Sequence, residues 1–210
     1  MNKKFKVLVV DDHSVVRHGI SLLLEKAFPE VVITHADNFD NLIIKLKEKQ
    51  DLVFLDIGLP GGNSTKMVEE IRLLYPDLLI MMFSAYDEAH YALRYIHAGA
   101  NGFLNKYSSD EEILLAVQSI IKTGKYISNI VKDKIVENAL YNLPINPLSK
   151  LSEREIEVAE LLVSGEGNIE ISNKLNIQTT TVSTFKSRIF EKLGINNVVK
   201  LIEILKVYNN

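Results

Sequence analysis

The chain of 210 residues contains no cysteine, which excludes disulfides, thiolate metal sites and cysteine nucleophiles. It also lacks any apolar run approaching the roughly 20 residues that cross a bilayer as a helix. Within a few residues of Met1 the sequence enters a predicted strand beginning at Phe5, so we expect no cleavable signal there. Together these absences predict a cytoplasmic protein without a membrane segment.

Residues 1 to about 125 show alternating strand and helix patterns. Short apolar runs predict strands at 5–10, 31–34, 52–55, 78–83 and 102–105, and helices fit near 14–27, 38–48, 64–74, 87–98 and 109–123. This alternation is typical of an α/β domain, with a parallel sheet covered by helices on both faces. Ser108 and Glu111 predict a capping box at the start of the last of these helices.

Polar side chains follow several of these strands at the point where each strand ends. Asp11 and Asp12 follow the first run, and Asp56 follows the four apolar residues 52–55. The carboxyl ends of parallel strands form the edge where open α/β sheets bind ligands. Three converging carboxylates repel one another and favour a bound cation. Magnesium fits best, because it takes one or two carboxylates, keeps several waters and brings in a phosphate.

Two further strand ends extend this predicted pocket. The run 78–83 leads into Ser84, and the run 102–105 leads into Lys106. A hydroxyl and an ammonium are suited to contact the oxygens of a phosphoryl group. The five histidines show no metal-ligand spacing, so we interpret them as ordinary, partly exposed residues: His13, His18, His35, His90 and His97.

Residues 126–147 are predicted to form a linker, because Pro144 and Pro147 disfavour helix in the residues before them. An apolar stripe predicts a short helix at the start of this linker: Ile127, Ile130, Val131 and Ile135. From Leu148 onward the chain is predicted to be helical throughout. Ser152 and Glu155 predict a capping box. Two helices joined by about three residues then form a helix-turn-helix over about 168–193, whose second helix enters the major groove of double-stranded DNA.

The strand-end residues Asp11, Asp12, Asp56, Ser84 and Lys106, in this order, resemble the receiver domain of bacterial two-component response regulators. The resemblance implies a flavodoxin-like (βα)5 fold in which a sensor histidine kinase phosphorylates Asp56. It also implies that Asp11, Asp12, Asp56 and the backbone carbonyl of Gly58 bind Mg²⁺. Ser84 and Lys106 are expected to contact the phosphoryl oxygens, and Phe103 to move with the Ser84 hydroxyl.

A second resemblance lies in segments 151–155, 169–175, 181–182 and 192–195, which are similar to the four-helix LuxR-type DNA-binding domain. The whole chain thus resembles the NarL/FixJ response regulators, with a receiver at 1–125, a linker at 126–147 and a helix-turn-helix domain at 148–210. The resemblance implies a homodimer on phosphorylation, helped by a final helix at 198–208. The residues expected to contact DNA are Lys174, Thr179, Thr181, Ser183, Thr184, Lys186, Ser187 and Arg188.

The DNA-binding segment departs from the family pattern in sequence and in charge. Ser183 and Phe185 stand where a lysine and a histidine are usual, so base preference does not transfer from other members. Gln178 replaces the usual capping serine, which makes Thr179 the expected cap. Residues 148–210 carry eight Lys or Arg and eight Asp or Glu, so the segment is neutral overall.

Two alternative functions remain open from the sequence. One is a DNA-binding regulator with an atypical receiver that works without phosphate, although such a receiver has no need of Asp11, Asp12 and Lys106 together. The other is a magnesium-dependent aspartyl-phosphate phosphatase. That class usually has a second aspartate two residues after its nucleophile, where this chain has Gly58, so we do not expect an enzyme.

Overall fold

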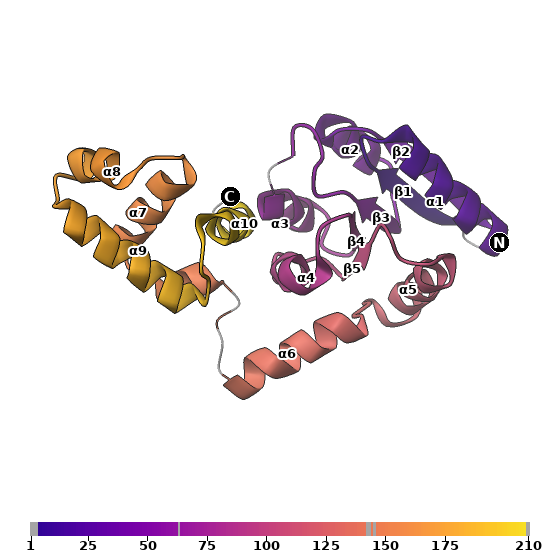
Figure 1. The fold of residues 1–210 in the computed structure, drawn as a ribbon. Helices are drawn as coiled ribbons and strands as arrows, with labels where there is room; N and C mark the ends of the chain where they lie inside the picture. The colour runs from indigo at the N-terminus through magenta and orange to yellow at the C-terminus, as the bar shows by residue number, and fades with distance from the viewer. Residues whose placement is uncertain (1–3, 63, 142–143, 145, 209–210) are drawn as a thin grey trace. The chain divides into compact units, whose positions relative to one another are not determined.

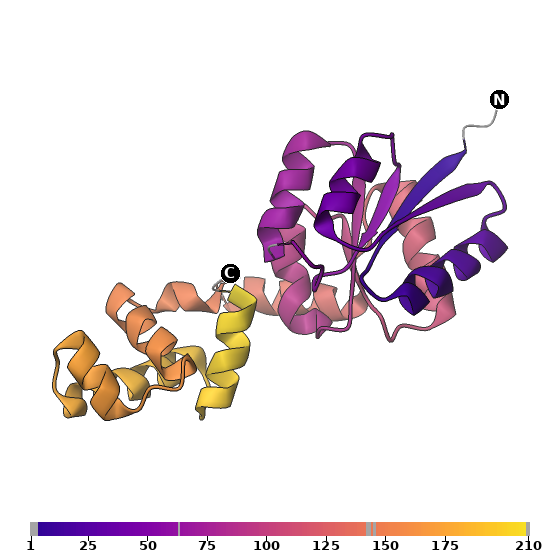
Figure 2. The same ribbon diagram turned by 90° about the horizontal axis from the view of Figure 1, so that it is seen from above.

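The chain folds into two compact units, Met1–Val136 and Glu137–Asn210 (Figures 1 and 2). The computed structural model describes residues 4–62, 64–141, 144 and 146–208. Within these residues, no helix is long and apolar enough to span a membrane.

The first unit is built on a parallel five-stranded sheet with the strand order β2-β1-β3-β4-β5. Val10 of β1 lies beside Ala36 of β2 and Leu55 of β3, so the carboxyl ends of these strands are level. The sheet is doubly wound around β1, which places its ligand-binding edge beyond the carboxyl ends. Its strands are β1 (Phe5–Val10), β2 (Val31–Ala36), β3 (Leu52–Leu55), β4 (Leu79–Ser84) and β5 (Gly102–Asn105).

Helices cover both faces of this sheet because successive strand residues point to opposite sides. Leu8 and Val10 of β1 pack into the core beneath α2, α3 and α4. Val7 and Val9 pack into the core beneath α1 and α5. The helices that follow the strands are α1 (Ser14–Ala27), α2 (Phe39–Leu46), α3 (Ser64–Leu74), α4 (Glu88–His97) and α5 (Asp110–Thr123).

The second unit is a small helical domain with a core of its own, centred on Val158, Ile171, Val182, Ile189 and Leu201. Its elements are the 3₁₀ helix η1 (Pro147–Lys150) and the α-helices α7 (Glu153–Val163), α8 (Asn168–Leu175), α9 (Thr179–Leu193) and α10 (Val198–Tyr208). The helix α6 (Asn129–Tyr141) precedes them; it starts in the first unit, where Val131 is buried in the core, and crosses the division between the units.

The helix ends confirm some capping predictions and correct others. The Ser152–Glu155 capping box is present, with both reciprocal hydrogen bonds. The box predicted at Ser108 and Glu111 is wrong by one residue, because Ser109 caps α5 by accepting a hydrogen bond from the Glu112 amide. Thr179 is also not a cap: it is the first helical residue of α9, and the cap position Gln178 makes no side-chain capping bond.

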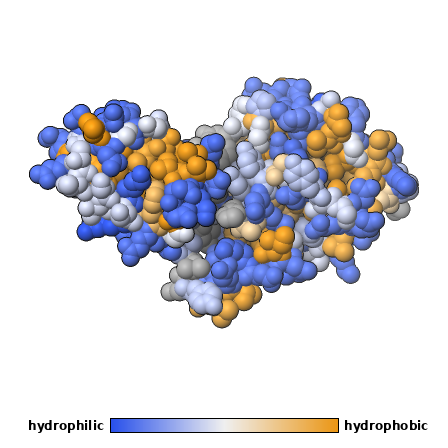
Figure 3. All heavy atoms as spheres, in the orientation of Figure 1, coloured by the Kyte–Doolittle hydropathy of each residue, from blue (hydrophilic) through white to orange (hydrophobic). Residues whose placement is uncertain are grey.

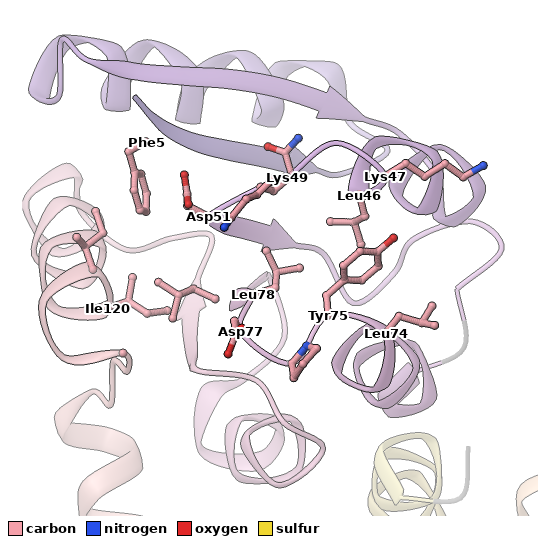
Figure 4. A pocket seen from close by; sticks show the side chains of 15 residues that line it. Phe5, Leu46, Lys47, Lys49, Asp51, Leu74, Tyr75, Asp77, Leu78 and Ile120 are labelled. Atoms are coloured by element: carbon pink, nitrogen blue, oxygen red, sulfur yellow. The ribbon is translucent and has the colours of Figure 1, made fainter. Parts of the chain in front are cut away.

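The surface of both units mixes hydrophilic and hydrophobic side chains (Figure 3). Val15 and Leu22 on α1, and Leu140 on α6, are among the exposed hydrophobic residues. A hollow of about 630 Å³ lies at the amino ends of the strands, between Phe5, Asp51 and Leu78 (Figure 4). None of the predicted site residues lines this hollow, so the predicted chemistry belongs to the opposite edge of the sheet.

Candidate functional site

The carboxyl edge of the sheet brings Asp11, Asp56 and Lys106 into direct contact. The Lys106 ammonium nitrogen lies 2.6 Å from Asp11 Oδ2 and 3.1 Å from Asp56 Oδ1. Backbone hydrogen bonds between neighbouring strands hold these residues in place, because the Asp56 amide donates to the Val10 carbonyl and the Lys106 amide donates to the Ser84 carbonyl. All three side chains are largely buried, with exposed fractions of 2%, 8% and 14% respectively for Asp11, Asp56 and Lys106.

Burial and charge act in opposite directions on the two partners of this ion pair. Burial raises the pKa of the Asp56 carboxyl, the neighbouring Lys106 lowers it, and the Asp11 carboxylate raises it again, so the net shift is upward. Burial alone lowers the pKa of Lys106, but the hydrogen bonds and charges of Asp11 and Asp56 outweigh burial, and the pKa is raised. The ammonium therefore stays charged and attracts both the carboxylates and an incoming anion.

Asp12 and His13 lie directly beside Asp11, and their side chains are more exposed than that of Asp11. His13 Nδ1 lies 2.6 Å from Asp12 Oδ1 and 3.3 Å from Asp11 Oδ1, and the His13 amide donates to Asp11 Oδ1. One ligand atom from each of Asp11, Asp12 and His13 falls within a span of 4.8 Å. The sequence interpretation missed His13, although its place directly after the acidic pair was a signal.

The residues at this edge fit a hard divalent cation. Asp11, Asp12 and Asp56 supply three carboxylates against the single ammonium of Lys106. One divalent ion would balance the remaining two negative charges, and carboxylate oxygens are the ligands that Mg²⁺ prefers. Receiver domains generally bind Mg²⁺ at such a pocket. The predicted role of the Gly58 carbonyl stays a prediction, although Gly58 lies close to the carboxylate: a Cβ there would lie 3.6 Å from Asp56 Oδ2.

Ser84 is the last residue of β4 and Phe103 lies within β5, and the structure shows both side chains in contact with other partners. Ser84 is 1% exposed, and its hydroxyl oxygen accepts a hydrogen bond of 3.3 Å from the Tyr86 amide. Phe103 is also 1% exposed, and its ring centroid lies 6.4 Å from that of Tyr95 within the core. In this structure the aromatic ring is therefore turned inward, and the hydroxyl closes the loop after β4.

The second unit presents a polar face of α9 to solvent. Val182 and Ile189 point into the core, which leaves Thr180, Thr184 and Arg188 exposed. A hollow of about 260 Å³ lies along this helix and is lined by Thr180, Thr181, Thr184, Phe185 and Arg188. Hydroxyls and a guanidinium are groups that contact base edges and phosphates in a major groove.

The predicted DNA-contacting residues differ in how free they are to reach DNA. Lys174 is paired with Glu166 at 2.5 Å. Ser183 accepts a hydrogen bond from Asn168 and donates one to the Thr179 carbonyl. The Lys186 ammonium lies 5.8 Å from the centre of the Phe190 ring. Thr179, Ser187 and Arg188 are exposed and Thr181 is half-buried, all on the same helix. The sequence interpretation missed Thr180 and Phe185 as neighbours of this face.

Comparison with known proteins matches each unit to a family. The model of the response regulator receiver domain matches residues 7–118, and that of the bacterial regulatory proteins of the luxR family matches residues 149–205. The Fimbriae Z protein of Escherichia coli (strain K12) is 32% identical over 207 residues, which cover 98% of each chain. The oxygen regulatory protein NreC of Staphylococcus aureus (strain JH9) is 31% identical, covering 94% of this chain and 95% of NreC.

Among solved structures, the fold is similar to that of RcsB from Salmonella enterica serovar Typhimurium bound to promoter P1flhDC. The TM-score is 0.76 at 24% identity, over 97% of this chain and 98% of RcsB. A receiver followed by a helix-turn-helix domain on one chain defines a two-component response regulator. The chain belongs to the NarL/FixJ family of these regulators, which act by binding DNA.

Proposed function

We propose that a sensor histidine kinase phosphorylates Asp56, and that the phosphorylated protein dimerises and binds double-stranded DNA in the cytoplasm. The contact of Lys106 with both Asp11 and Asp56 carries this proposal, because it places one ammonium beside the carboxylate that would accept the phosphoryl group. The resemblance of the chain to NarL/FixJ regulators supports the partners.

The reaction transfers one phosphoryl group between two proteins. A carboxylate oxygen of Asp56 attacks phosphorus, an O–P bond forms, and the N–P bond to the kinase histidine breaks. The Lys106 ammonium offsets charge on the phosphoryl oxygens, and the Ser84 hydroxyl can turn from its present partner toward them. The carboxylates of Asp11, Asp12 and Asp56 and the Gly58 carbonyl would hold Mg²⁺, which supplies further neutralisation of the phosphoryl charge.

Phosphorylation then changes the charge of a largely buried pocket. An aspartyl phosphate adds roughly −1.5 to −2 of charge where Asp56 stood. We expect Lys106 and Ser84 to respond to this charge, and Phe103, whose ring packs against Tyr95 in the core, to move with the hydroxyl. A two-fold dimer would place two α9 helices in successive major grooves, about 34 Å apart along the DNA.

The decisive experiment is the intact mass of wild type and Asp56→Asn after incubation with magnesium and acetyl phosphate. We expect a single phosphoryl adduct on wild type and none on Asp56→Asn, because the amide lacks the nucleophilic oxygen. Asp40→Asn, which removes an exposed carboxylate from α2, serves as the matched control and should still be modified. An adduct on Asp56→Asn would rule out Asp56 as the acceptor.

The same three proteins test the effect on DNA. Duplexes are first selected from a random pool with phosphorylated wild type, and their affinity is then measured with and without acetyl phosphate. Wild type and Asp40→Asn should gain affinity on phosphorylation, whereas Asp56→Asn should gain none. An equal gain in Asp56→Asn would indicate a regulator that works without phosphate on this residue.

A further inference from the structure

Arg17 of α1 reaches back to the loop that carries the acidic pair. Its Nη1 donates one hydrogen bond of 2.5 Å to the Asp11 carbonyl and a second of 3.2 Å to the Asp12 carbonyl. In the described part of the chain, neither carbonyl oxygen has a backbone partner at this point, where the sheet ladder has ended. The guanidinium thus replaces the missing backbone hydrogen bonds of the loop.

These two bonds fix the direction of the carboxylates. With both carbonyls held toward α1, the Asp11 side chain is left to point across the pocket, where it meets Lys106. Arg17 also brings a positive charge close to the backbone of the acidic pair. A guanidinium suits this role because its planar nitrogen carries two hydrogens at fixed angles, one for each carbonyl.

Arg17 is itself anchored through its backbone. The Ser21 hydroxyl donates to the Arg17 carbonyl at 2.8 Å, and His35 Nε2 lies 2.7 Å from the same hydroxyl oxygen. Because the hydroxyl hydrogen is used on Arg17, His35 donates to Ser21 and ties α1 to the edge strand β2. The base of the Arg17 side chain is therefore held in place, which lowers the entropy lost when its guanidinium binds the loop.

We propose that Arg17 is a positioning residue of the divalent-cation site: it holds the Asp11–Asp12 loop in its metal-binding form without touching the cation. The proposal rests on the proposed function, since it assumes that Asp11 and Asp12 bind Mg²⁺. Residues that orient metal ligands from behind typically change metal affinity about 10- to 100-fold when they are replaced. Arg17 should therefore act on the affinity for the ion and leave the chemistry of Asp56 unchanged once the ion is bound.

The test is a titration of Mg²⁺ into metal-free, full-length protein by calorimetry, repeated with Mn²⁺ by electron paramagnetic resonance. We expect Arg17→Ala to raise the dissociation constant about tenfold. Arg17→Gln should recover part of the loss, because its amide still donates a hydrogen bond to one carbonyl. Lys26→Ala removes a cation from the last turn of the same helix and should stay within about twofold of wild type.

A second measurement separates positioning from a general loss of structure. The initial rate of adduct formation from acetyl phosphate is followed against the magnesium concentration. For Arg17→Ala and Arg17→Gln we expect the midpoint of this curve to move to higher magnesium while the maximum rate stays near that of wild type. A lowered maximum with an unchanged midpoint would overturn the positioning role.

The outcomes keep this inference apart from the proposed function. If wild type and both Arg17 variants bind Mg²⁺ equally, the role of Arg17 is refuted while the magnesium site stands. If wild type itself binds no Mg²⁺, the magnesium site and the Arg17 inference fall together. If Arg17→Ala does not fold, Arg17→Gln decides the question, since it keeps a polar side chain of intermediate length.

Discussion

At the scale of single residues, the surroundings of Asp56 disfavour its ionised form in the absence of a bound cation. The net upward shift in the pKa of Asp56 means that burial and the Asp11 carboxylate outweigh the attraction of Lys106. A carboxyl whose folded pKa exceeds its unfolded value adds stability below the unfolded pKa and loses it as the pH rises through the folded pKa. At neutral pH the ionised Asp56 therefore destabilises the metal-free protein.

This sign leads to a prediction for Asp56→Asn. In EDTA at pH 7.5, the variant should unfold at a higher temperature than wild type, because the neutral amide avoids both the burial cost and the repulsion. The advantage should shrink as the pH falls, because the raised pKa lets the wild-type carboxyl take up a proton at a higher pH than an ordinary aspartate does. Thermal unfolding followed by circular dichroism measures both temperatures, and a lower midpoint for the variant in EDTA would contradict the charge balance. Added Mg²⁺ should stabilise wild type more than Asp56→Asn.

The same scale shows which contacts sequence can predict. Asp11, Asp56 and Lys106 could be placed together because each directly follows a strand of one parallel sheet, and strand ends meet at a shared edge. The contacts that His13 and Arg17 make with the acidic pair could not be predicted from the sequence, because they depend on how the loop backbone turns after β1. The ion pairs of α8 and α9 could not be predicted either, because their partners are distant in the sequence. Lys174 pairs with Glu166, eight residues away, and Lys192 pairs with Glu155, 37 residues away.

At the scale of the elements, helix ends are set by single hydrogen bonds. The Ser109 hydroxyl captures the Glu112 amide, one residue later than the sequence pattern indicated. Ser108 and Ser109 offer the same group, and only the path of the chain after Lys106 decides between them. Where one serine alone was available, as at Ser152, the predicted cap is confirmed.

The cap of α7 gives a prediction at this scale. Ser152→Ala removes the hydroxyl that accepts from the Glu155 amide and should cost about 1 kcal/mol. For a domain of 60–100 residues this corresponds to a fall of about 4–8 °C in the unfolding midpoint of the second unit. Ser164→Ala, which deletes an exposed hydroxyl at the other end of the same helix, should change the midpoint little, and equal losses in both would argue against capping.

At the scale of the whole molecule, the two units have separate cores. Among the residues that the structure describes, those buried on the sheet and those buried in the second unit form separate clusters. The alternation of strand and helix up to residue 123 made the first unit predictable, and the capping and turn residues did the same for the second. In the linker region a short helix was predicted from its apolar stripe, and α6 extends from Asn129 to Tyr141. That it begins inside the first core, where Val131 is buried, could not be predicted, because an apolar stripe alone does not show which surface it packs against.

Separate cores should give separate unfolding transitions. Ile171→Ala empties part of the second core, where the side chain is fully buried, and should destabilise that unit by about 2–5 kcal/mol. In calorimetry of the full chain, we expect this variant to lower one transition and Mg²⁺ to raise the other. A single transition that responds to both changes would show that the units unfold together.

The ion pairs of the helix-turn-helix domain also bear on how the protein searches a genome. Attraction to random DNA comes from counterions that lysines and arginines release from the phosphates. The logarithm of the affinity therefore falls by about 0.9 per phosphate contact for each log unit of salt concentration. Lys174 and Lys192 already hold carboxylate partners, and the domain is neutral. With these cations paired and the domain neutral, we expect weak binding to random DNA. If the protein dimerises as proposed, its occupancy of a promoter would then depend on the two α9 helices acting together.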